Sequence, residues 1–344
     1  MNTILKELKK KSLLSRKGIV EQNKDINIAD TVVNDTVIVS GKVLKRKRVS
    51  LNYKSCKVKV CSMCPFPNDG ISTSIDDKYV FEQLNSSGCK KEKYDMLTLY
   101  HNGNFFADNE ISPDLRNKIY SYISNLDISH FVVESLPQTI TEQKLQSFKD
   151  ACPNIKLHVA MGVQTMDTFL REYAILSNFS ENDLSNAINN LKAYGYIPRV
   201  FLMYGIPFLN NKESLQTIIN DVKIIKERYN IEENIVICPL VIMPNTLVNE
   251  ISNKTECKAP EIEDINDLIL ALSFYDLKPK ITINSSVYEY TGDSFKRDQY
   301  LKIKENLMLF NENMFTAKLK KIEMHEYNKD NVVSNIKSFL KVND

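Results

Sequence analysis

The sequence predicts an α/β protein folded as a full or partial (β/α) barrel of the TIM type, with about six parallel strands. Short apolar runs rich in β-branched and aromatic residues alternate with helical stretches along the chain. Polar residues follow several of these runs directly, as expected where strands end at a functional edge. With 344 residues and 43% hydrophobic content, the chain can form one large domain or two modest ones.

The strands and the helices are predicted from runs of different periodicity. Strands suited to a sheet buried on both faces are predicted at 48–53, 96–102, 130–136, 156–164, 197–204, 235–242 and 280–284. Apolar residues at helical spacing predict helices at 76–85, 113–125, 141–151, 182–193, 212–228 and 261–273. Typical helix starts are Ser112 before Pro113, Thr139 three residues before Glu142, and Ser180.

The chain is expected to divide into a barrel and two extensions. Residues 1–47 are predicted to form an N-terminal extension, with a small ribbon at 32–43 and a basic run at 42–48. Residues 48–285 are predicted to form the barrel, and residues 286–344 a C-terminal helical extension. The net charge of +2 demands neither a nucleic acid nor a membrane, and no run approaches the roughly 18 apolar residues of a membrane span. A cytoplasmic protein is therefore the default expectation.

Three cysteines with the spacing C-x4-C-x2-C lie on a predicted loop, 54–70, after the first strand: Cys56, Cys61 and Cys64. A structural zinc site is closed by four ligands, whereas three thiolates on an iron–sulfur cluster leave one iron open for chemistry. A zinc site with Cys89 or His101 as a remote fourth ligand is the alternative. The scattered cysteines are expected to be mostly small buried hydrophobes: Cys89, Cys152, Cys238 and Cys257.

Polar or turn-forming residues lie where consecutive predicted strands end, from the second strand to the fifth: Gly103 with Asn104, Glu134, Gln164 and Tyr204. The carboxyl ends of parallel strands meet at one edge of a sheet, so these residues should share a mouth with the cysteine loop. Glu134 closes an apolar strand, where a carboxylate is costly to bury without a partner.

This arrangement resembles the radical S-adenosylmethionine (radical SAM) superfamily, in which a three-cysteine loop follows the first strand of a βα barrel. The usual spacing there is C-x3-C-x2-C, and the first gap here is one residue longer. The finer resemblance is to the branch of the Elongator catalytic subunit, which includes the archaeosine-synthase radical SAM subunit. Within residues 48–275, variants of that branch's motifs lie at 61–66, 103–110, 133–137 and 162–165. Leu136 replaces an arginine of the branch.

The resemblance implies a [4Fe–4S] cluster and S-adenosylmethionine (SAM) as cofactors. Cys56, Cys61 and Cys64 would ligate three irons, and SAM would bind the fourth through its amino and carboxylate groups. One electron, from a donor such as flavodoxin or ferredoxin, would cleave the sulfonium to methionine and a 5′-deoxyadenosyl radical, which abstracts hydrogen from the substrate. The cofactors carry this step, and the protein positions and shields them.

Four candidate contacts to SAM lie on or near the loops after the first two strands. By resemblance, Met63 and Phe66 would flank the adenine. Gly103 and Asn104 would bind the amino group of SAM, because glycine permits close backbone approach and asparagine supplies a carbonyl acceptor. Loop packing for the first pair and a simple strand-to-helix turn for the second are the alternatives.

Four further candidates lie on or after the third to fifth strands. Glu134 and Gln164 are expected at the ribose or the substrate. Arg171, on the helix after the fourth strand, is expected to pair with the carboxylate of SAM, and Arg199 in the fifth strand is its rival. A salt bridge at Glu134 and an exposed helix charge at Arg171 are the alternatives. No catalytic acid or base is predicted.

Three classes of function stay open at the level of sequence. The first is a radical SAM enzyme that acts on a small-molecule or peptide-derived substrate in a biosynthetic pathway, with no membrane partner. The second is a tRNA-base modification enzyme or subunit, favoured by the basic run at 42–48 and the lysine-rich N-terminus. The third is a non-enzymatic metal-binding protein, which zinc in place of iron would favour.

Overall fold

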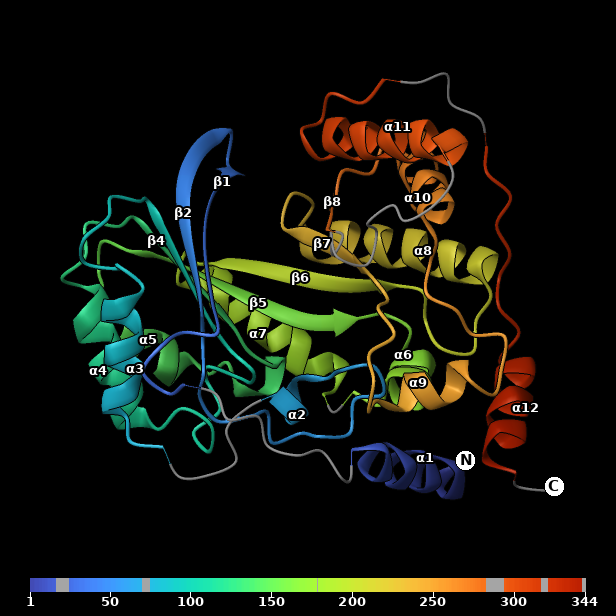
Figure 1. Ribbon diagram of the computed structural model, residues 1–344, viewed down its shortest axis with the longest axis horizontal. Helices are drawn as coiled ribbons and strands as arrows, with labels where there is room; N and C mark the ends of the chain where they lie inside the picture. The colour runs from blue at the N-terminus through green and yellow to red at the C-terminus, as the bar shows by residue number, and fades with distance from the viewer. Residues whose placement is uncertain (17–24, 70–74, 178, 283–293, 317–320, 342–344) are drawn as a thin grey trace.

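The curled sheet of this protein carries its strands in sequence order, from β1 to β8 (Figure 1). The computed structural model describes residues 1–16, 25–69, 75–177, 179–282, 294–316 and 321–341. Within them, β1 (Thr31–Val39) pairs antiparallel with β2 (Lys42–Leu51), and every later pair of neighbours is parallel. The sheet curls into a partial barrel, which confirms the predicted fold class.

The later strands lie at the predicted runs. They are β3 (Met96–His101), β4 (His130–Glu134), β5 (Lys156–Gln164), β6 (Ile197–Tyr204), β7 (Ile235–Pro239) and β8 (Lys280–Ile281). The bounds of β5 and β6 are those predicted, because both are largely apolar runs with turn residues nearby. Since β2 to β8 all run in the same direction, their carboxyl ends meet at one edge of the sheet.

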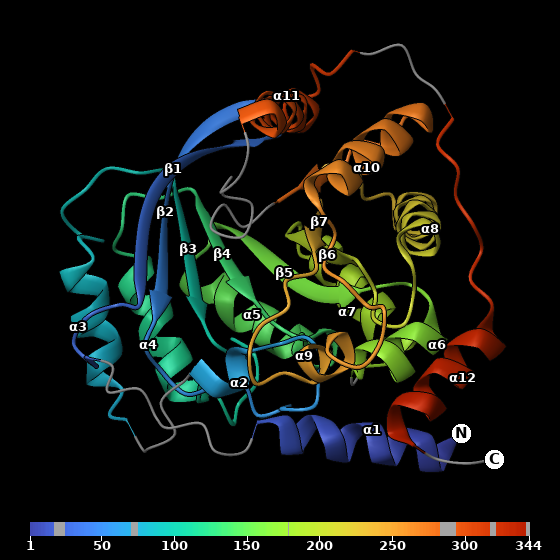
Figure 2. The ribbon, with the colours of Figure 1, turned by 45° about the vertical axis from the view of Figure 1, so that its right-hand side comes forward.

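Helices pack along the outside of the curled sheet (Figure 2). All six predicted helices are present: α3 (Lys78–Ser86), α4 (Pro113–Ile123), α5 (Glu142–Ala151), α7 (Glu181–Ala193), α8 (Asn211–Tyr229) and α10 (Ile262–Phe274). Each presents an apolar stripe to the sheet, so its hydrophobic periodicity and its packing agree.

Two of the three predicted helix starts are confirmed and one was wrong. The side chains of Ser112 and Ser180 each accept a hydrogen bond from the backbone N–H three residues later. Helix α5 begins after Thr141 instead of at Thr139. Thr139 lies in the short 3-10 turn η1 (Pro137–Thr139), where its hydroxyl donates to the carbonyl of Leu136.

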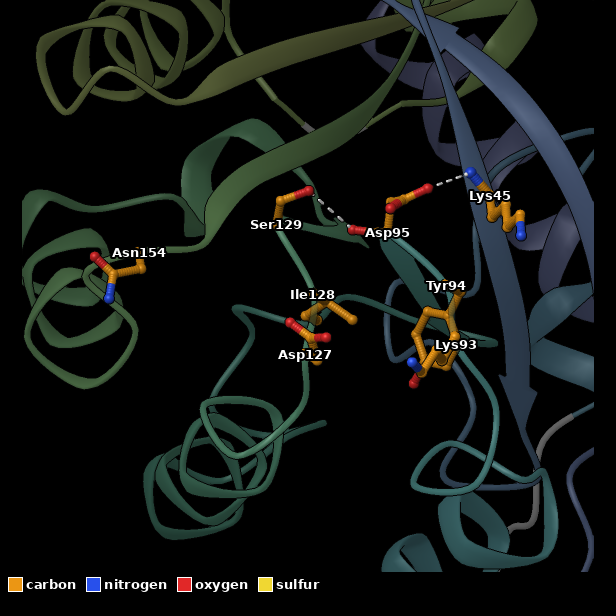
Figure 3. Close-up of a pocket in the computed structure, with 8 residues that line it drawn as sticks. All are labelled: Lys45, Lys93, Tyr94, Asp95, Asp127, Ile128, Ser129 and Asn154. Carbon is orange, nitrogen blue, oxygen red and sulfur yellow. Dashed lines mark hydrogen bonds between the residues drawn. The ribbon is translucent and has the colours of Figure 1, made fainter.

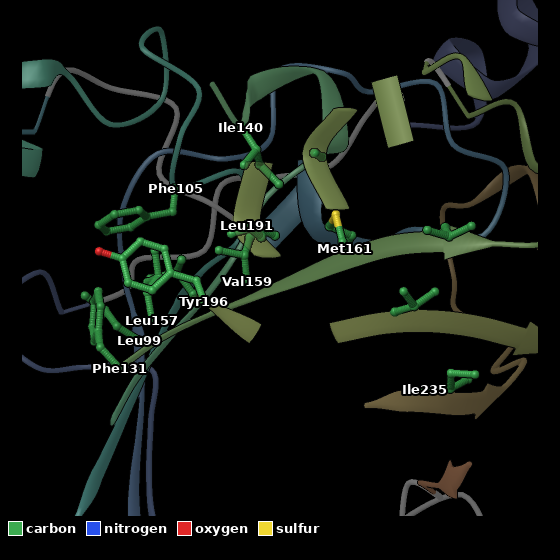
Figure 4. Packing of buried hydrophobic residues seen from close by; sticks show 14 of the residues in the cluster. Leu99, Phe105, Phe131, Ile140, Leu157, Val159, Met161, Leu191, Tyr196 and Ile235 are labelled. Carbon is green, nitrogen blue, oxygen red and sulfur yellow. The ribbon is translucent and has the colours of Figure 1, made fainter. Parts of the chain in front are cut away.

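Side chains alternate between the two faces of each strand, and this alternation separates the core from the barrel interior. On β5, Leu157, Val159 and Met161 belong to the main hydrophobic cluster between the sheet and the helices, where they meet residues such as Leu191 of α7 (Figure 4). The residues between them point to the inner face of the curled sheet. Polar side chains on the strands are thereby placed where a ligand can reach them.

A second hydrophobic cluster lies at the carboxyl edge and joins both ends of the chain. The remaining elements are α1 (Asn2–Ser15), α2 (Phe66–Asp69), α6 (Thr168–Leu170), η2 (Arg171–Ile175), α9 (Leu247–Ser252), α11 (Ser294–Asn311) and α12 (Lys329–Leu340). The cluster includes Leu8 of α1, Val248 of α9 and Ile336 of α12. Helices α1 and α12 lie side by side in both views (Figures 1 and 2). None of the described helices is long and apolar enough to span a membrane.

The first parallel strand begins six residues before the predicted start at residue 48, since β2 starts at Lys42. The basic run at 42–48 is therefore part of a β-hairpin. Three of its basic side chains have partners that are remote in the sequence. Arg46 and Arg48 contact Asp35 on β1, and the buried Lys47 donates to the carbonyl of Ser87 at 2.9 Å. The division of the chain at residues 47 and 285 stays a prediction.

Candidate active site

The three clustered cysteines follow β2 at the carboxyl edge of the sheet. All three are free thiols and are partly exposed. Burial raises the pKa of Cys61 to about 12, and the neighbouring charge of Cys56 raises it further. Burial and the charge of Cys61 likewise raise the pKa of Cys64. The three thiols thus lie close enough to influence one another, and binding a metal would have to displace their protons.

Polar hydrogens are directed at two of these sulfur atoms. The Sγ of Cys56 accepts from the backbone N–H groups of Val58 and Lys59, and Asn104 Nδ2 lies 3.6 Å from it. The Sγ of Cys64 accepts from the backbone N–H of Phe66. Such donors stabilise thiolates and tune iron–sulfur clusters, so the chemistry of this donor set fits a cluster.

A closed zinc site would need a fourth ligand near the three cysteines, and the described residues do not provide one. Among the described residues, no group of three or more His, Cys, Asp and Glu side chains is arranged to hold a metal ion. Cys89 is buried beside Tyr94, and His101 lies 3.8 Å from Glu110. Neither of the two expected remote ligands is therefore placed to complete a closed four-ligand zinc site with the loop cysteines.

Glu110 connects the cysteine loop to the turn after β3. One of its carboxylate oxygens accepts from the backbone N–H of Lys57 at 3.0 Å, and the carboxylate also accepts from the backbone and the side-chain amide of Asn104. A Cβ at Gly103 would collide with this carboxylate, so a larger residue there would force Glu110 out of its present position. Burial lowers the pKa of His101, next to Glu110, to about 4, which keeps its imidazole neutral at pH 7.

Asn104 also ties these loops to the end of β4. Its Oδ1 accepts from the backbone N–H of Leu136 at 3.0 Å, and the backbone N–H of Phe105 donates to the carbonyl of Glu134 at 2.9 Å. The ends of three consecutive strands are thereby joined by hydrogen bonds around one asparagine. The structure brings Gly103, Asn104 and Glu134 together with the cysteine loop, as the strand-end pattern predicted.

Glu134 and Arg199 face each other across the inside of the barrel. The strand register places Glu134 of β4 beside Ala160 of β5, and Ala160 beside Arg199 of β6. The small alanine leaves space between the two charged side chains. Burial raises the pKa of Glu134 to about 7, against the opposing effect of Arg199. Burial also lowers the pKa of Arg199.

Gln164 ends β5 in an unusual conformation. Its φ is +67°, in the left-handed region that side chains other than glycine and asparagine seldom adopt. The pairing of β5 with β6 shifts register between Gly162 and Gln164. The side-chain amide of Gln164 lies close to Gly162 at this irregularity, and such features are often found at functional sites.

The other predicted contacts differ in what surrounds them. Met63 is partly buried against the second hydrophobic cluster, whereas Phe66 is 44% exposed at the start of α2. Arg171 is buried in η2, where it donates to the carbonyl of Thr165 at 3.1 Å and senses the charge of Asp221. Arg171 is therefore held in a structural network, while Arg199 makes no hydrogen bond with a described residue.

The chain is 24% identical over 219 residues to archaeosine synthase subunit beta of Methanosarcina acetivorans, a match that covers 60% of this chain and 63% of that protein. It is 23% identical to an uncharacterized protein of Methanocaldococcus jannaschii, over 82% of this chain and 78% of that one. Its fold matches methylornithine synthase with a TM-score of 0.50 at 12% identity, over 98% of this chain and 87% of that one. No model of a known protein family matches.

The resemblance to the radical SAM superfamily is confirmed. The match to archaeosine synthase subunit beta falls in the branch that the cysteine loop and the strand-end motifs indicated. The match to methylornithine synthase covers the partial barrel and supports the fold. The chain is thus similar to archaeosine synthase subunit beta and shares the fold of methylornithine synthase. It spans less than two thirds of the length of the archaeosine synthase subunit, so its reaction and substrate are matters for proposal.

Two residues of this candidate site escaped the sequence prediction. The sequence marks Glu110 only as the last residue of the motif at 103–110, although its carboxylate accepts hydrogen bonds from two loops. Arg16, at the end of α1, donates from Nη1 to the carbonyl of Cys64 at 2.8 Å and from Nη2 to the carbonyl of Cys61 at 2.7 Å. No local pattern signals either role, because their partners are distant in the sequence.

A polar pocket of about 370 Å³ lies away from the candidate active site, at the opposite edge of the sheet (Figure 3). It is lined by residues that precede β3 and β4, among them Asp95 and Ser129. Asp95 there accepts from the backbone N–H of Lys45 at 2.7 Å and, through its own carbonyl, from the hydroxyl of Ser129 at 3.2 Å. These bonds join the starts of neighbouring strands, which is a structural role at this edge of a barrel.

Proposed function

We propose that this chain holds a [4Fe–4S] cluster on Cys56, Cys61 and Cys64 and uses it to cleave SAM reductively. The observation that carries the proposal is the set of three free thiols, with N–H groups directed at two of them, at the carboxyl edge of a partial barrel. When bound, the cluster and SAM supply methionine and a 5′-deoxyadenosyl radical that takes a hydrogen atom from the substrate. The protein supplies position, orientation and exclusion of water.

The residues around the loop would divide the binding of SAM among them. Gly103 would let the ligand approach the backbone closely, next to the loop that Asn104 orients. Glu134 and Gln164 offer a carboxyl and an amide for the ribose hydroxyls or the substrate. Met63 and Phe66 would cover the adenine.

Arg199 is the better candidate for the carboxylate of SAM or of the substrate. Its rival Arg171 already donates to a backbone carbonyl and lies in the field of Asp221, whereas Arg199 has no hydrogen-bond partner among the described residues. A guanidinium that lies on the inner face, opposite Glu134, can offer a bidentate fork to a carboxylate.

The substrate is proposed to be a small or peptide-derived molecule that fits inside the barrel, and a tRNA base is the second candidate. The second candidate is favoured by exposed lysines on both segments next to the site: Lys6 on α1, and Lys57 and Lys59 on the cysteine loop. The hydroxyl of Ser12 donates to the carbonyl of Val60 at 2.9 Å and holds these segments together. Lysines near an active site can bind the phosphates of a nucleic acid. The branch that the chain resembles includes tRNA-base modification enzymes.

The decisive experiment is anaerobic reconstitution with iron and sulfide, followed by reduction in the presence of SAM. We expect about four irons per chain and the appearance of 5′-deoxyadenosine by mass spectrometry. Both should disappear when the three loop cysteines are replaced by alanine, and both should persist in Cys257→Ala, which removes a buried cysteine elsewhere. Binding of zinc without iron in the wild-type protein would contradict the proposal and favour a non-enzymatic metal-binding protein.

The two substrate classes differ in their dependence on salt. If tRNA is the substrate, bulk tRNA should bind to the reconstituted protein with an affinity that falls steeply as salt rises. The double variant Lys57→Gln, Lys59→Gln should then show a shallower dependence. Binding that is absent at low salt would leave the small or peptide-derived substrate as the proposal.

A further inference from the structure

Helix α1 is fixed over the cysteine loop by one face. This face carries residues spaced four apart, which lie on the same side of a helix: Ile4, Leu8, Ser12 and Arg16. Ile4 and Leu8 are buried in the second hydrophobic cluster, and the fully buried Ser12 donates to the carbonyl of Val60. The helix therefore delivers Arg16 to the cysteine loop from a firmly anchored position.

We propose that Arg16 is a positioning residue for the iron–sulfur cluster, which holds two of its ligands in place and supplies a permanent positive charge beside it. The proposal rests on the function proposed above, since it requires that the cluster be bound. It assigns a role to the N-terminal helix, which the sequence left as an extension of unknown purpose.

The geometry is that of a fork across two ligands. Nη1 and Nη2 of Arg16 donate to the carbonyls of Cys64 and Cys61 at 2.8 and 2.7 Å. A planar guanidinium can hold two acceptors at a fixed separation, whereas the ammonium of a lysine is a compact point charge on a flexible stem. Arg16 thus fixes the backbone at both ends of the segment 61–64. This segment carries two of the three cysteines that would bind the cluster.

The charge of Arg16 acts on the cluster through its surroundings. The guanidinium is partly buried and lies in the field of all three cysteine thiols. Reduction adds one negative charge to a cluster with three thiolate ligands, and a nearby positive charge stabilises that reduced state. Arg16 therefore raises the reduction potential and makes the electron transfer that begins catalysis easier.

The experiment compares two replacements of Arg16 in the full-length, anaerobically reconstituted protein without SAM. The midpoint potential is measured by redox titration with electron paramagnetic resonance detection, and the loss of iron to a chelator is followed by absorbance. Arg16→Gln should shift the reduction equilibrium about tenfold toward the oxidised cluster, which is about 59 mV for a one-electron couple, and should release iron several-fold faster. Arg16→Lys keeps the charge but not the fork, so its potential should stay near that of the wild type while its iron is lost faster.

The matched control is Lys10→Gln, which removes one positive charge from the same helix. The side chain of Lys10 is 65% exposed, pairs with Glu7, and lies on the face of the helix opposite Leu8 and Ser12. We expect its potential and its rate of iron loss to equal those of the wild type. Equal shifts in Lys10→Gln and Arg16→Gln would overturn the proposal, because they would reflect the charge of the helix as a whole.

The outcomes separate this proposal from the one on which it rests. A wild-type protein that binds no iron would refute the cluster itself. A wild-type protein with a cluster, together with Arg16→Gln at the same potential and the same rate of iron loss, would refute the role of Arg16 alone. If both Arg16 variants lose iron, an unchanged circular dichroism spectrum supports positioning, and a loss of helical signal makes Arg16 a folding residue and contradicts the proposal.

Discussion

At the scale of single residues, two buried or half-buried charges of opposite sign hold the cysteine loop at its two ends. Glu110 accepts the backbone N–H of Lys57, next to Cys56, and Arg16 donates to the carbonyls of Cys61 and Cys64. A charged group bonded to backbone makes a stronger hydrogen bond than a neutral one, which suits a loop with little secondary structure of its own.

The pKa of Glu134 predicts a pH dependence of stability in the iron-free protein. Burial raises this pKa from 4.5 to about 7, so between these values the unfolded chain loses a proton that the folded chain retains. The contribution of Glu134 to the free energy of unfolding is therefore full below pH 4.5 and falls as the pH rises to about 7. In Glu134→Gln this fall in the free energy of unfolding should be absent, a difference on the order of 3 kcal/mol across the window.

The measurement is urea denaturation of the wild type and Glu134→Gln between pH 4 and 8. Buried histidines titrate in the same range with the opposite sign, since burial lowers the pKa of His101 and His158, but they are common to both proteins and cancel in the difference. Glu227→Gln, at an exposed position of α8, should follow the wild type at every pH. A flat difference curve for Glu134→Gln would show that Glu134 ionises normally in the folded protein.

At the scale of secondary structure, hydrophobic periodicity predicted those elements whose side chains do not depend on polar partners remote in the sequence. The bounds of β5 and β6 agree with prediction because their hydrophobic residues mark the whole strand. The start of β2 was missed because Arg46 and Lys47 look like loop residues, and only Asp35 on β1 and the carbonyl of Ser87 show how a strand accommodates them. Partners that are remote in sequence decide such cases.

The end of β5 allows a test that separates strain from binding. Gln164→Ala removes the amide but keeps a side chain at φ +67°, and Gln164→Gly removes both the amide and the steric conflict. We expect both variants to bind SAM more weakly with unchanged iron content, if the amide contacts the ligand. The glycine variant should also be the more stable of the two by up to about 1 kcal/mol.

SAM binding to the reconstituted variants is measured by isothermal titration calorimetry, and stability by urea denaturation of the iron-free proteins. The two variants differ only in backbone freedom, so each serves as the control for the other. SAM affinity equal to that of the wild type in both would remove Gln164 from the site. Weak binding in the alanine variant alone would indicate a role for the strained backbone instead of the amide.

At the scale of the whole molecule, the mouth of the barrel is assembled from the two ends of the described chain. The sequence predicted the cysteines and the strand ends, because both depend on local patterns. It did not predict that α1 and α12 pack together beside them, since helix-to-helix contact at such separation leaves no periodic signal. The ammonium group of Lys11 on α1 also lies 5.3 Å from the ring centre of Phe339 on α12, a cation–π contact between the two helices.

This assembly predicts that a cavity in α12 will loosen α1. Ile336 is fully buried in the second cluster, so Ile336→Ala should cost about 2–5 kcal/mol of the free energy of unfolding. Because α12 supports α1, the backbone amides of α1 should exchange with deuterium faster, by about tenfold for each 1.4 kcal/mol of local stability lost. Leu145→Ala makes a similar cavity in the main cluster and should leave the exchange of α1 unchanged. Wild-type exchange of α1 in Ile336→Ala would show that α1 is held by the cysteine loop and not by the second cluster.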